Sequence, residues 1–253
     1  MTRERLYRTE AIVIRRSDIG EADRLLTIYT PGGKLRVAAR GIRKTTSKLA
    51  GHLELFTWTQ LLLARGRTFD VVAQSQTLRP FRQLRDDLER IGWAYYIAEL
   101  LDKMTHEGDE NRPLFSLLVE TLTALDELDD SLLQDLVVRR FELYLLGLLG
   151  YRPHLYRCAR CQEELTSESD RLSPQSGGML CPRCAPMEPL ALPVTLSAFK
   201  LIRFFQREPL TSVLQLRVRP EVLREVEILL QALIRPHLER DLKSLAFLQA
   251  VRS

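Results

Sequence analysis

The spacing of the apolar residues changes once along this 253-residue chain, near Pro80, and this change constrains the fold more than any other feature. Before Pro80, short apolar segments are separated by glycine-containing turns, which is typical of β-strands. From Phe81 onward, apolar residues recur at intervals of three and four, which is typical of helices. The sequence therefore predicts an α+β protein, with a β domain over 1–80 and a helical domain over 81–253.

Five strand-like segments precede Pro80. In the first of them, Ile12 and Ile14 alternate with Ala11 and Val13. Five short strands with glycine-containing connections are typical of a small barrel, and at this length we expect a five-stranded OB-fold barrel. An SH3-like barrel fits the same pattern. The segments are 9–16, 23–30, 34–40, 53–63 and 69–78.

All four cysteines fall into two C-x2-C pairs, with nineteen residues between the pairs. Each pair lets two thiolates point to one side of a tight turn, and two such turns complete a tetrahedral shell of soft ligands. Four thiolates leave no open coordination position, so we expect one structural zinc per chain. It would stabilise an insert over 157–188 that is too small to bury a core of its own. The ligands would be Cys158, Cys161, Cys181 and Cys184.

Other uses of the cysteines stay open. Two disulfides fit poorly with a chain that shows no export signal, and free thiols seldom fall into paired spacing. An iron–sulfur cluster has no further support in the sequence. Glycine often follows the second cysteine of such a turn, whereas Gln162 and Ala185 stand in these places here.

Positive charge is concentrated in the segment 34–48, which contains six cations and no acidic residue. Lys and Arg number 15 against 7 Asp and Glu in residues 1–80, 7 against 15 in 81–150, and 15 against 11 in 151–253. Because side chains alternate along a strand, Leu35 and Val37 would point inward and the cations outward. We expect a phosphate-binding face that is largely blind to base sequence. Its residues would be Lys34, Arg36, Arg40, Arg43, Lys44 and Lys48, extended by Arg65 and Arg67.

Alternative interpretations apply to several of these groups. The basic segment could be a solvated surface, with the binding patch instead around Arg203 and Arg207. Phe56 and Trp58 share one face of the fourth predicted strand and either stack on bases or fill the barrel interior, and the interior is favoured. Arg139 and Arg140 precede an apolar run. They form either a cationic rim that binds a partner or a solvated surface.

Signatures of several other protein classes are absent from the sequence. No glycine-rich phosphate loop, dinucleotide fingerprint or nucleophile elbow occurs, which favours a binding protein over an enzyme. The His-Leu-Glu triplets at 52–54 and 237–239 lack the context of a zinc deaminase. The N-terminus has no apolar export segment. The longest uncharged apolar run, 143–151, is far shorter than a membrane span, so we expect a cytoplasmic protein without membrane contact.

Residues 17–51, "SDIGEADRLLTIYTPGGKLRVAARGIRKTTSKLAG", resemble the N-terminal signature of the RecO family of bacterial recombination mediators. The resemblance continues in order along the chain, with a C-x2-C pair after "LGLLGYRPHL" and a closing "LKSLAFL". It implies an OB-fold followed by a helical domain with a zinc insert. By motif, the basic positions of the family fall here on Arg36, Arg40, Arg43, Lys44 and Lys48.

The resemblance further implies a non-enzymatic protein that acts in DNA repair, binds single- and double-stranded DNA and anneals complementary strands. It implies partnership with RecR and with the acidic C-terminal tail of the single-strand-binding protein. It also implies help in loading the RecA recombinase on coated strands, at the nucleoid of the bacterial cytoplasm. From the residues alone, two rivals remain. One is a zinc-ribbon protein for RNA or transcription, and the other is a metal-dependent nuclease or deaminase, which four thiolates disfavour.

Overall fold

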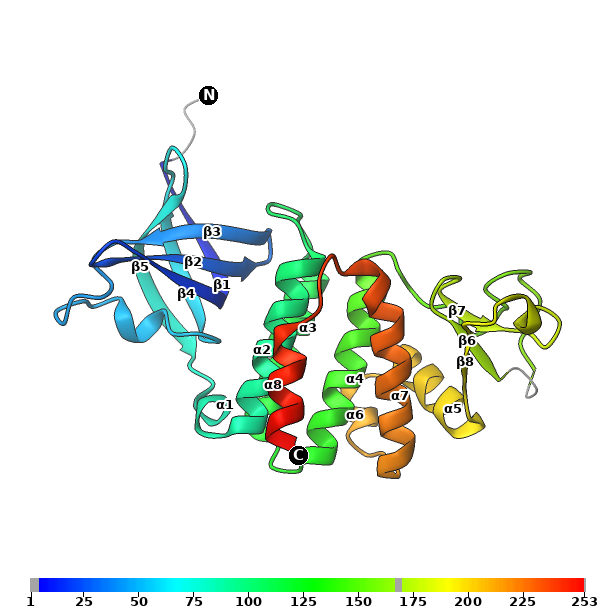
Figure 1. The fold of residues 1–253 in the computed structure, drawn as a ribbon. Helices are drawn as coiled ribbons and strands as arrows, with labels where there is room; N and C mark the ends of the chain where they lie inside the picture. Colours follow the sequence, from blue (N-terminus) through cyan, green and yellow to red (C-terminus); the bar gives the residue numbers. More distant parts are fainter. Residues whose placement is uncertain (1–4, 167–169, 253) are drawn as a thin grey trace. The chain divides into compact units, whose positions relative to one another are not determined.

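The structure of the protein is a computed structural model that describes residues 5–166 and 170–252 (Figure 1). It divides into two compact units, one of Met1–Glu127 with Leu242–Ser253 and one of Leu128–Asp241. Secondary structure changes from strand to helix at Pro80, since the last strand of the first sheet ends at Arg79. The first helix begins at Arg82. The compact unit that contains this sheet, however, also includes helices. Some of them precede the second unit in the sequence, and one follows it.

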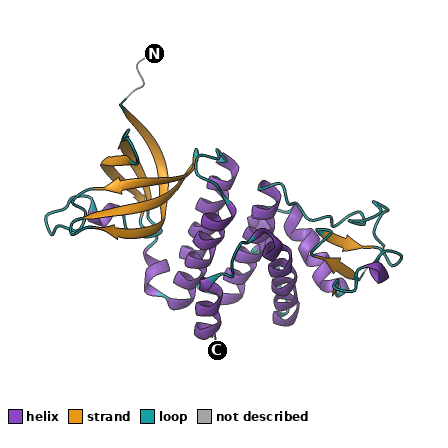
Figure 2. Cartoon of the chain, turned by 45° about the horizontal axis from the view of Figure 1, so that its top comes forward, coloured by secondary structure: helices purple, strands orange, loops and turns teal. Residues whose placement is uncertain are grey.

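The first unit begins with a five-stranded sheet, drawn in orange in Figure 2. Its strands pair in a ring in the order β1-β2-β3-β5-β4, with β4 returning to β1. All pairs are antiparallel except β3 with β5, which meet in parallel over the short register Val37–Asp70 and Ala38–Val71. The strands are β1 (Leu6–Ile19), β2 (Asp23–Thr30), β3 (Gly33–Ala39), β4 (Trp58–Ala64) and β5 (Asp70–Arg79).

The sheet encloses an apolar core because alternate side chains of each strand point to the same side. Strand β1 departs from strict alternation, since residues 11–14 are all buried. The pairing of β1 with β2 shifts register between Val13 and Arg15, and helix α2 (Leu88–Met104) packs against β1. The buried core residues are Ala11, Val13, Leu26, Ile28, Val37, Ala39, Ile42, Leu53, Leu61, Leu63 and Val72.

The fourth strand starts five residues later than the pattern predicts, because residues 53–57 form turns. Phe56 has a positive φ of 63° and is 1% exposed, and its ring makes an edge contact with Tyr95 of α2, with centroids 5.1 Å apart. Trp58 is half-buried, and its indole N–H donates to Glu10 at 3.1 Å. Phe56 is therefore a core residue, as favoured, although it packs on a helix and lies outside the strand.

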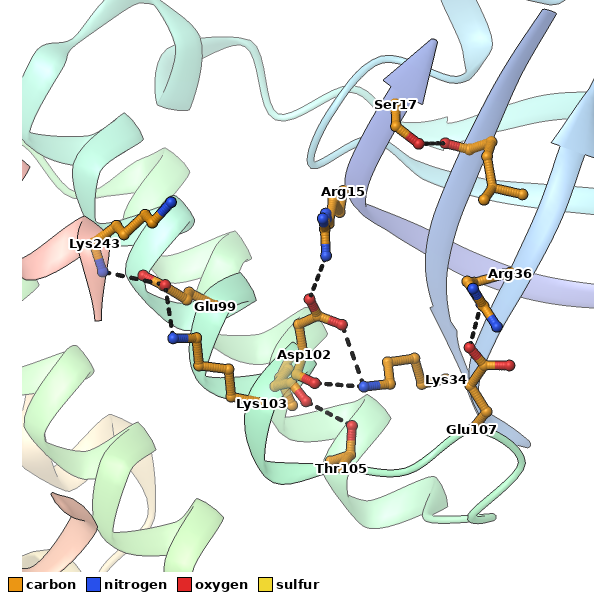
Figure 3. A network of polar contacts seen from close by, with 12 residues as sticks. Arg15, Ser17, Lys34, Arg36, Glu99, Asp102, Lys103, Thr105, Glu107 and Lys243 are labelled. Atoms are coloured by element: carbon orange, nitrogen blue, oxygen red, sulfur yellow. Dashed lines mark hydrogen bonds and ion pairs between the residues drawn. The ribbon is translucent and has the colours of Figure 1, made fainter. Parts of the chain in front are cut away.

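Four helices complete the first unit: α1 (Arg82–Asp86), α2, α3 (Arg112–Glu127) and α8 (Lys243–Arg252). Helix α2 is buried on several sides, including Trp93 and Tyr96, whereas Leu88 and Tyr95 are exposed. Helix α8 packs on α2. The Glu99 carboxylate accepts hydrogen bonds from the backbone N–H of residues 243 and 244, and so caps the start of α8 (Figure 3).

The second unit begins with α4 (Ser131–Leu148), which Asp130 caps by accepting from the backbone N–H of residues 132 and 133. Helix α4 is buried by packing against other helices of its unit. Within the part of the chain that the structure describes, we find no helix whose length and apolar content would let it cross a membrane. The remaining elements are β6 (Arg171–Ser173), β7 (Gly178–Leu180), β8 (Leu192–Pro193), α5 (Leu196–Arg207), α6 (Leu210–Val213) and α7 (Pro220–Ile234).

Candidate nucleic-acid interface and candidate metal centre

Strand β3 has an apolar inner side and a polar outer side, as its alternation predicts. Val37 and Ala39 are buried in the core of the sheet, and Arg36 and Arg40 are exposed. The cations of β3 are not all equivalent, however, because carboxylates from distant parts of the same unit contact some of them. The groups that contact each predicted cation therefore decide whether its charge is available to a ligand.

Lys34 lies at the buried beginning of β3, and its side chain is only 10% exposed. Its ammonium donates to the backbone oxygen of Asp102 on α2, and it lies 3.2 Å from the carboxylate of the same residue (Figure 3). Asp102 also pairs with Arg15 of β1 at 3.3 Å. Lys34 thus fastens the sheet to a helix within the first unit and does not present its charge to solvent.

Arg36 is half-exposed, and its Nε lies 2.5 Å from a carboxylate oxygen of Glu107 (Figure 3). Glu107 belongs to the loop between α2 and α3, and this loop is held along β3 by a hydrogen bond from the Gly108 N–H to the Lys34 carbonyl at 3.0 Å. Gly33 permits the close approach, because a Cβ at this position would lie 2.2 Å from the Asp109 carbonyl oxygen. Sequence reasoning missed these carboxylates, although the acidic composition of residues 81–150 was their signal.

The loop after β3 is held in place at its start. Ile42 is buried in the core of the sheet, and the Gly41 N–H donates to Asp23 at 2.7 Å. Arg43 donates to the Gly20 carbonyl at 3.1 Å and lies 3.5 Å from the Asp18 carboxylate. Three cations of this region are exposed and have no carboxylate partner among the described residues: Arg40, Lys44 and Lys48.

The turn between β4 and β5 adds two further cations, Arg65 and Arg67, and both are exposed. The guanidinium of Arg36 lies over the ring of Phe69, 5.2 Å from its centroid, which places this turn beside β3. Arg65 lies over the Tyr7 ring at 4.8 Å. Burial and a hydrogen bond to Asp70 raise the pKa of Tyr7, so this ring stays neutral and does not compensate the Arg65 charge.

Arg139 and Arg140 lie neither on a rim nor on a solvated surface, so both interpretations of the sequence were wrong. They are 1% and 6% exposed. Arg139 pairs with Glu142 on the same helix at 3.3 Å and with Glu227 of α7 at 3.5 Å, and Arg140 lies over the Tyr144 ring at 4.2 Å. The signal was present, because Arg139 and Glu142 are three residues apart on one face of an apolar helix.

The four cysteines meet in one cluster in the second unit. Their sulfur atoms all lie within 4.8 Å of one another, three of the residues are buried, and none forms a disulfide. The first pair lies in the turn that follows Leu155. The second pair begins directly after β7 and leads into a short 3-10 helix at Ala185–Met187. Gly178 allows β7 to lie against the first segment, because a Cβ there would be 2.4 Å from the His154 carbonyl oxygen.

Backbone N–H groups point at the sulfur atoms of this cluster. The Cys181 N–H donates to the Cys158 sulfur at 3.3 Å. Burial raises the pKa of the Cys158 thiol, but hydrogen bonds from the backbone of residues 160, 161 and 181 outweigh it and lower the pKa to about 6. Burial and the neighbouring sulfur atoms raise the pKa of Cys184 to about 12. The backbone N–H groups therefore favour the anionic form of the Cys158 sulfur.

The spacing of the sulfur atoms fits a metal ion. In a tetrahedral site with metal–sulfur bonds of about 2.3 Å, neighbouring sulfur atoms are roughly 3.8 Å apart. The Cys161 and Cys181 sulfur atoms are 3.7 Å apart. Gln162, which follows the first pair, has a positive φ of 63°, which explains why glycine is common at this place. The four cysteines could therefore bind one metal ion in a closed shell of thiolates.

Fold and sites together define the class of protein: a two-unit α+β chain with a basic-faced five-stranded sheet and a four-cysteine cluster in its helical part. Residues 1–81 match the family model described as "Recombination protein O N terminal", and residues 85–246 match "Recombination protein O C terminal". The chain therefore belongs to the RecO family.

Individual relatives match nearly the whole chain. A protein of Roseiflexus sp. (strain RS-1) named "DNA repair protein RecO" is 55% identical over 250 residues, which cover 99% of this chain and 87% of the relative. A protein of the same name from Dehalococcoides mccartyi (strain ATCC BAA-2266 / KCTC 15142 / 195) is 37% identical, over 99% of this chain and 98% of its own length. Another from Pelotomaculum thermopropionicum is 38% identical over 96% of this chain and 94% of its own.

Proposed function

We propose that this protein is a non-enzymatic mediator of DNA repair that binds DNA through the outer face of its five-stranded sheet. The observation that carries the proposal is the set of exposed cations without carboxylate partners on this sheet, in a chain whose relatives are named DNA repair proteins. The uncompensated positions are Arg40, Lys44, Lys48 and Arg67, with Arg65 beside them.

The sheet would act as an OB-fold, and its ring of pairings in the order β1-β2-β3-β5-β4 supports this assignment. Lysine and arginine on such a surface bind phosphate, so single- and double-stranded DNA would bind with little base preference. Arg36 and Arg43 would also contact phosphate. Arg36 would then exchange its ion pair with Glu107 for the phosphate, and Arg43 its ion pair with Asp18. We leave Lys34 out of the proposed face, because its ammonium is buried against Asp102.

Neutralisation of the phosphates of two strands lowers their mutual repulsion, so the protein would anneal complementary strands without ATP. Residues 81–253 would recruit partners, namely RecR and the acidic C-terminal tail of the single-strand-binding protein, and so help to load RecA on coated strands in the cytoplasm. The DNA contact and the tail contact can each be weak, because once one of them forms, the effective concentration of the second partner at its site rises. Arg139 and Arg140 are left out of the tail site because they are buried.

The metal in the proposed function is one zinc ion held by Cys158, Cys161, Cys181 and Cys184. When bound, zinc supplies a cross-link and no catalysis, because four thiolates leave no open position. The chain's own residues provide the rest of the insert at 157–188. Glu188 accepts hydrogen bonds from Ser173 and Ser176, and it lies 3.8 Å from Arg160.

The proposal is tested by annealing of complementary strands coated with single-strand-binding protein, in the absence of nucleotide. Annealing should proceed with the intact coating protein and stop with a coating protein that lacks its acidic tail, while naked strands still anneal. If tail deletion had no effect, the partner-recruiting role of 81–253 would be wrong and DNA binding would remain. A protein that prefers RNA over DNA of equal length in competition would favour the zinc-ribbon alternative.

A further inference from the structure

A second surface of exposed cations and aromatics lies in the unit that does not contain the five-stranded sheet. Helix α5 contains three cations and no acidic residue. Its inner side is buried through residues such as Phe199 and Phe205, and Lys200 and Arg207 are exposed on the other side. Residues 151–162 likewise contain no acidic residue. Cations of both segments are therefore brought together on one surface if the two segments are neighbours.

Two contacts show that they are neighbours. The Gln206 side chain donates to the Pro153 carbonyl at 3.0 Å, and the Arg203 guanidinium lies over the Tyr156 ring, 4.2 Å from its centroid. The two contacts are separated by three residues on both segments, so the segment 153–156 runs along α5 toward the start of the helix. Figure 1 draws α5 beside the short strands of the insert, to which this segment leads.

Tyr156 is 40% exposed although the Arg203 guanidinium covers part of its ring. Arg203 also lies 5.2 Å from the Phe199 ring centroid, so its guanidinium is held flat by two aromatic rings. A planar guanidinium fixed on an exposed tyrosine is a ready surface for stacking a nucleobase. Because the geometry is already set, little side-chain entropy is lost when a base stacks there.

Several charges around this stack have no carboxylate in ion-pair contact. Among the described residues these are Arg152, Arg157, Lys200 and Arg203, although Glu164 lies opposite Arg157 in an isolated β-bridge. Arg207 pairs with Glu208 at 3.0 Å, and Arg160 lies 3.8 Å from Glu188. An aromatic platform flanked by free cations is the pattern with which proteins bind single strands, since the phosphates follow the cations and the bases stack. A duplex cannot use the platform, because its bases are already stacked on each other.

We propose that Tyr156 and Arg203, flanked by Arg157 and Lys200, form a second contact site for single-stranded DNA. The ligand class rests on the proposed function, which assigns DNA to the sheet. In that function a second site holds the incoming strand while the sheet holds the first, and it selects strands whose bases are unpaired.

The test is a comparison of two tyrosines of the same segment in the full chain, after the sheet has been weakened by Arg40→Ala, Lys44→Ala and Lys48→Ala. Tyr156→Leu keeps an apolar side chain on Arg203 but removes the stacking ring. Tyr151→Leu is the matched control, because Tyr151 is 49% exposed but stacks on His237 instead of an arginine. The probes are a fluorescent oligothymidine and a duplex of the same length, and thermal unfolding checks the fold of each variant.

Tyr156→Leu should weaken oligothymidine binding about 5- to 100-fold, the range of one lost base–aromatic stack, and leave duplex binding unchanged. Tyr151→Leu should change neither. Equal affinities of the two variants for oligothymidine, or an equal loss for both probes with a lowered unfolding midpoint, would overturn the second site and leave Tyr156 as a packing residue. A wild-type protein that binds no DNA at all would instead overturn the proposed function together with this inference.

Discussion

The five-stranded sheet and the cysteine insert are both built from strands, but different forces stabilise them. The sheet encloses a core of aliphatic side chains drawn from all five strands. The buried cluster of the insert consists of Cys158, Leu180, Cys181 and Cys184, and its strands β6 and β7 have three residues each. Apolar burial gives about 25 cal/mol per Å2, which such a small cluster cannot accumulate to a useful sum. We therefore expect the insert to depend on its thiols for stability, and the sheet to be stable without them.

The largest expected effect is the loss of the insert when a thiol is removed. Cys181→Ala, or removal of metal with a chelator, should abolish amide protection across 158–166 and 170–184 and leave protection in β2 and β3 as it was. The physical reason is that structural zinc contributes about 10–16 kcal/mol to comparable small folds. Hydrogen exchange read by mass spectrometry, with metal content measured in parallel, checks this. The control is Arg171→Ala, which removes a half-exposed cation of the insert that lies 3.8 Å from Asp170. Unchanged protection in the metal-free protein would show that the insert stays folded without its metal.

The converse change should damage the sheet and spare the insert. Leu61 is 0% exposed in the core of the sheet, so Leu61→Ala should lower the free energy of unfolding of the first unit by about 2–5 kcal/mol. Leu62→Ala is the matched control, because the next side chain points to the other side of β4 and is only half-buried. Denaturant unfolding gives the free energy, and metal content should stay at the wild-type value in both variants. Similar costs at the two positions would show that alternation does not define this core.

Duplex DNA binding should depend on the sheet and survive the loss of the insert. Arg40→Ala, Lys44→Ala and Lys48→Ala should each reduce the slope of log affinity against log salt by about 0.9 for duplex DNA, because each removes one phosphate contact. Arg16→Ala is the control, since Arg16 already pairs with Glu54 at 2.6 Å and should change the slope less. Titrations at several salt concentrations measure the slopes. An unchanged slope in the triple variant would place the DNA face elsewhere.

A smaller effect in the opposite direction is expected at Glu107. Glu107→Gln removes the carboxylate that holds Arg36, so this cation becomes available to phosphate, and the salt slope for duplex DNA should steepen by up to about 0.9. Glu110→Gln is the control on the same loop, because the Glu110 carboxylate lies 3.7 Å from the exposed Arg112 and pairs with no cation of β3 among the described residues. Equal affinities of the two variants would show that Arg36 does not contact DNA.

The smallest expected effect is a stabilisation of the insert by a substitution at Gln162. Gln162 adopts a left-handed backbone conformation, which costs a residue with a Cβ about 1–2 kcal/mol and costs glycine little. Gln162→Gly should therefore slow metal loss to a chelator by several-fold. Ala185→Gly is the control, because Ala185 begins a 3-10 helix in which glycine brings no relief. Faster metal loss from Gln162→Gly would mean that the glutamine side chain contributes more than its strain costs.

The sequence by itself determined the features that depend on neighbours along the chain. Five strands before Pro80 and helices after it follow from apolar periodicity, and the thiol cluster follows from two tight C-x2-C turns. The family was also readable, from the motif over 17–51. Local errors occurred where a long-range contact overrides the pattern. Residues 53–57 leave the strand pattern where Phe56 packs on α2.

Only the tertiary structure decided which cations of the basic segment are free. Lys34 meets Asp102 of α2, which is 68 residues away, and Arg36 meets Glu107 on the loop that follows α2. Lys44 and Lys48 meet no carboxylate in the described chain. Arg203 likewise reaches Tyr156 only because the segment after Gly150 runs back along α5. The reason is physical. Charge compensation and stacking depend on distances of a few ångströms between side chains, and long-range packing sets these distances without leaving a periodic trace in the sequence.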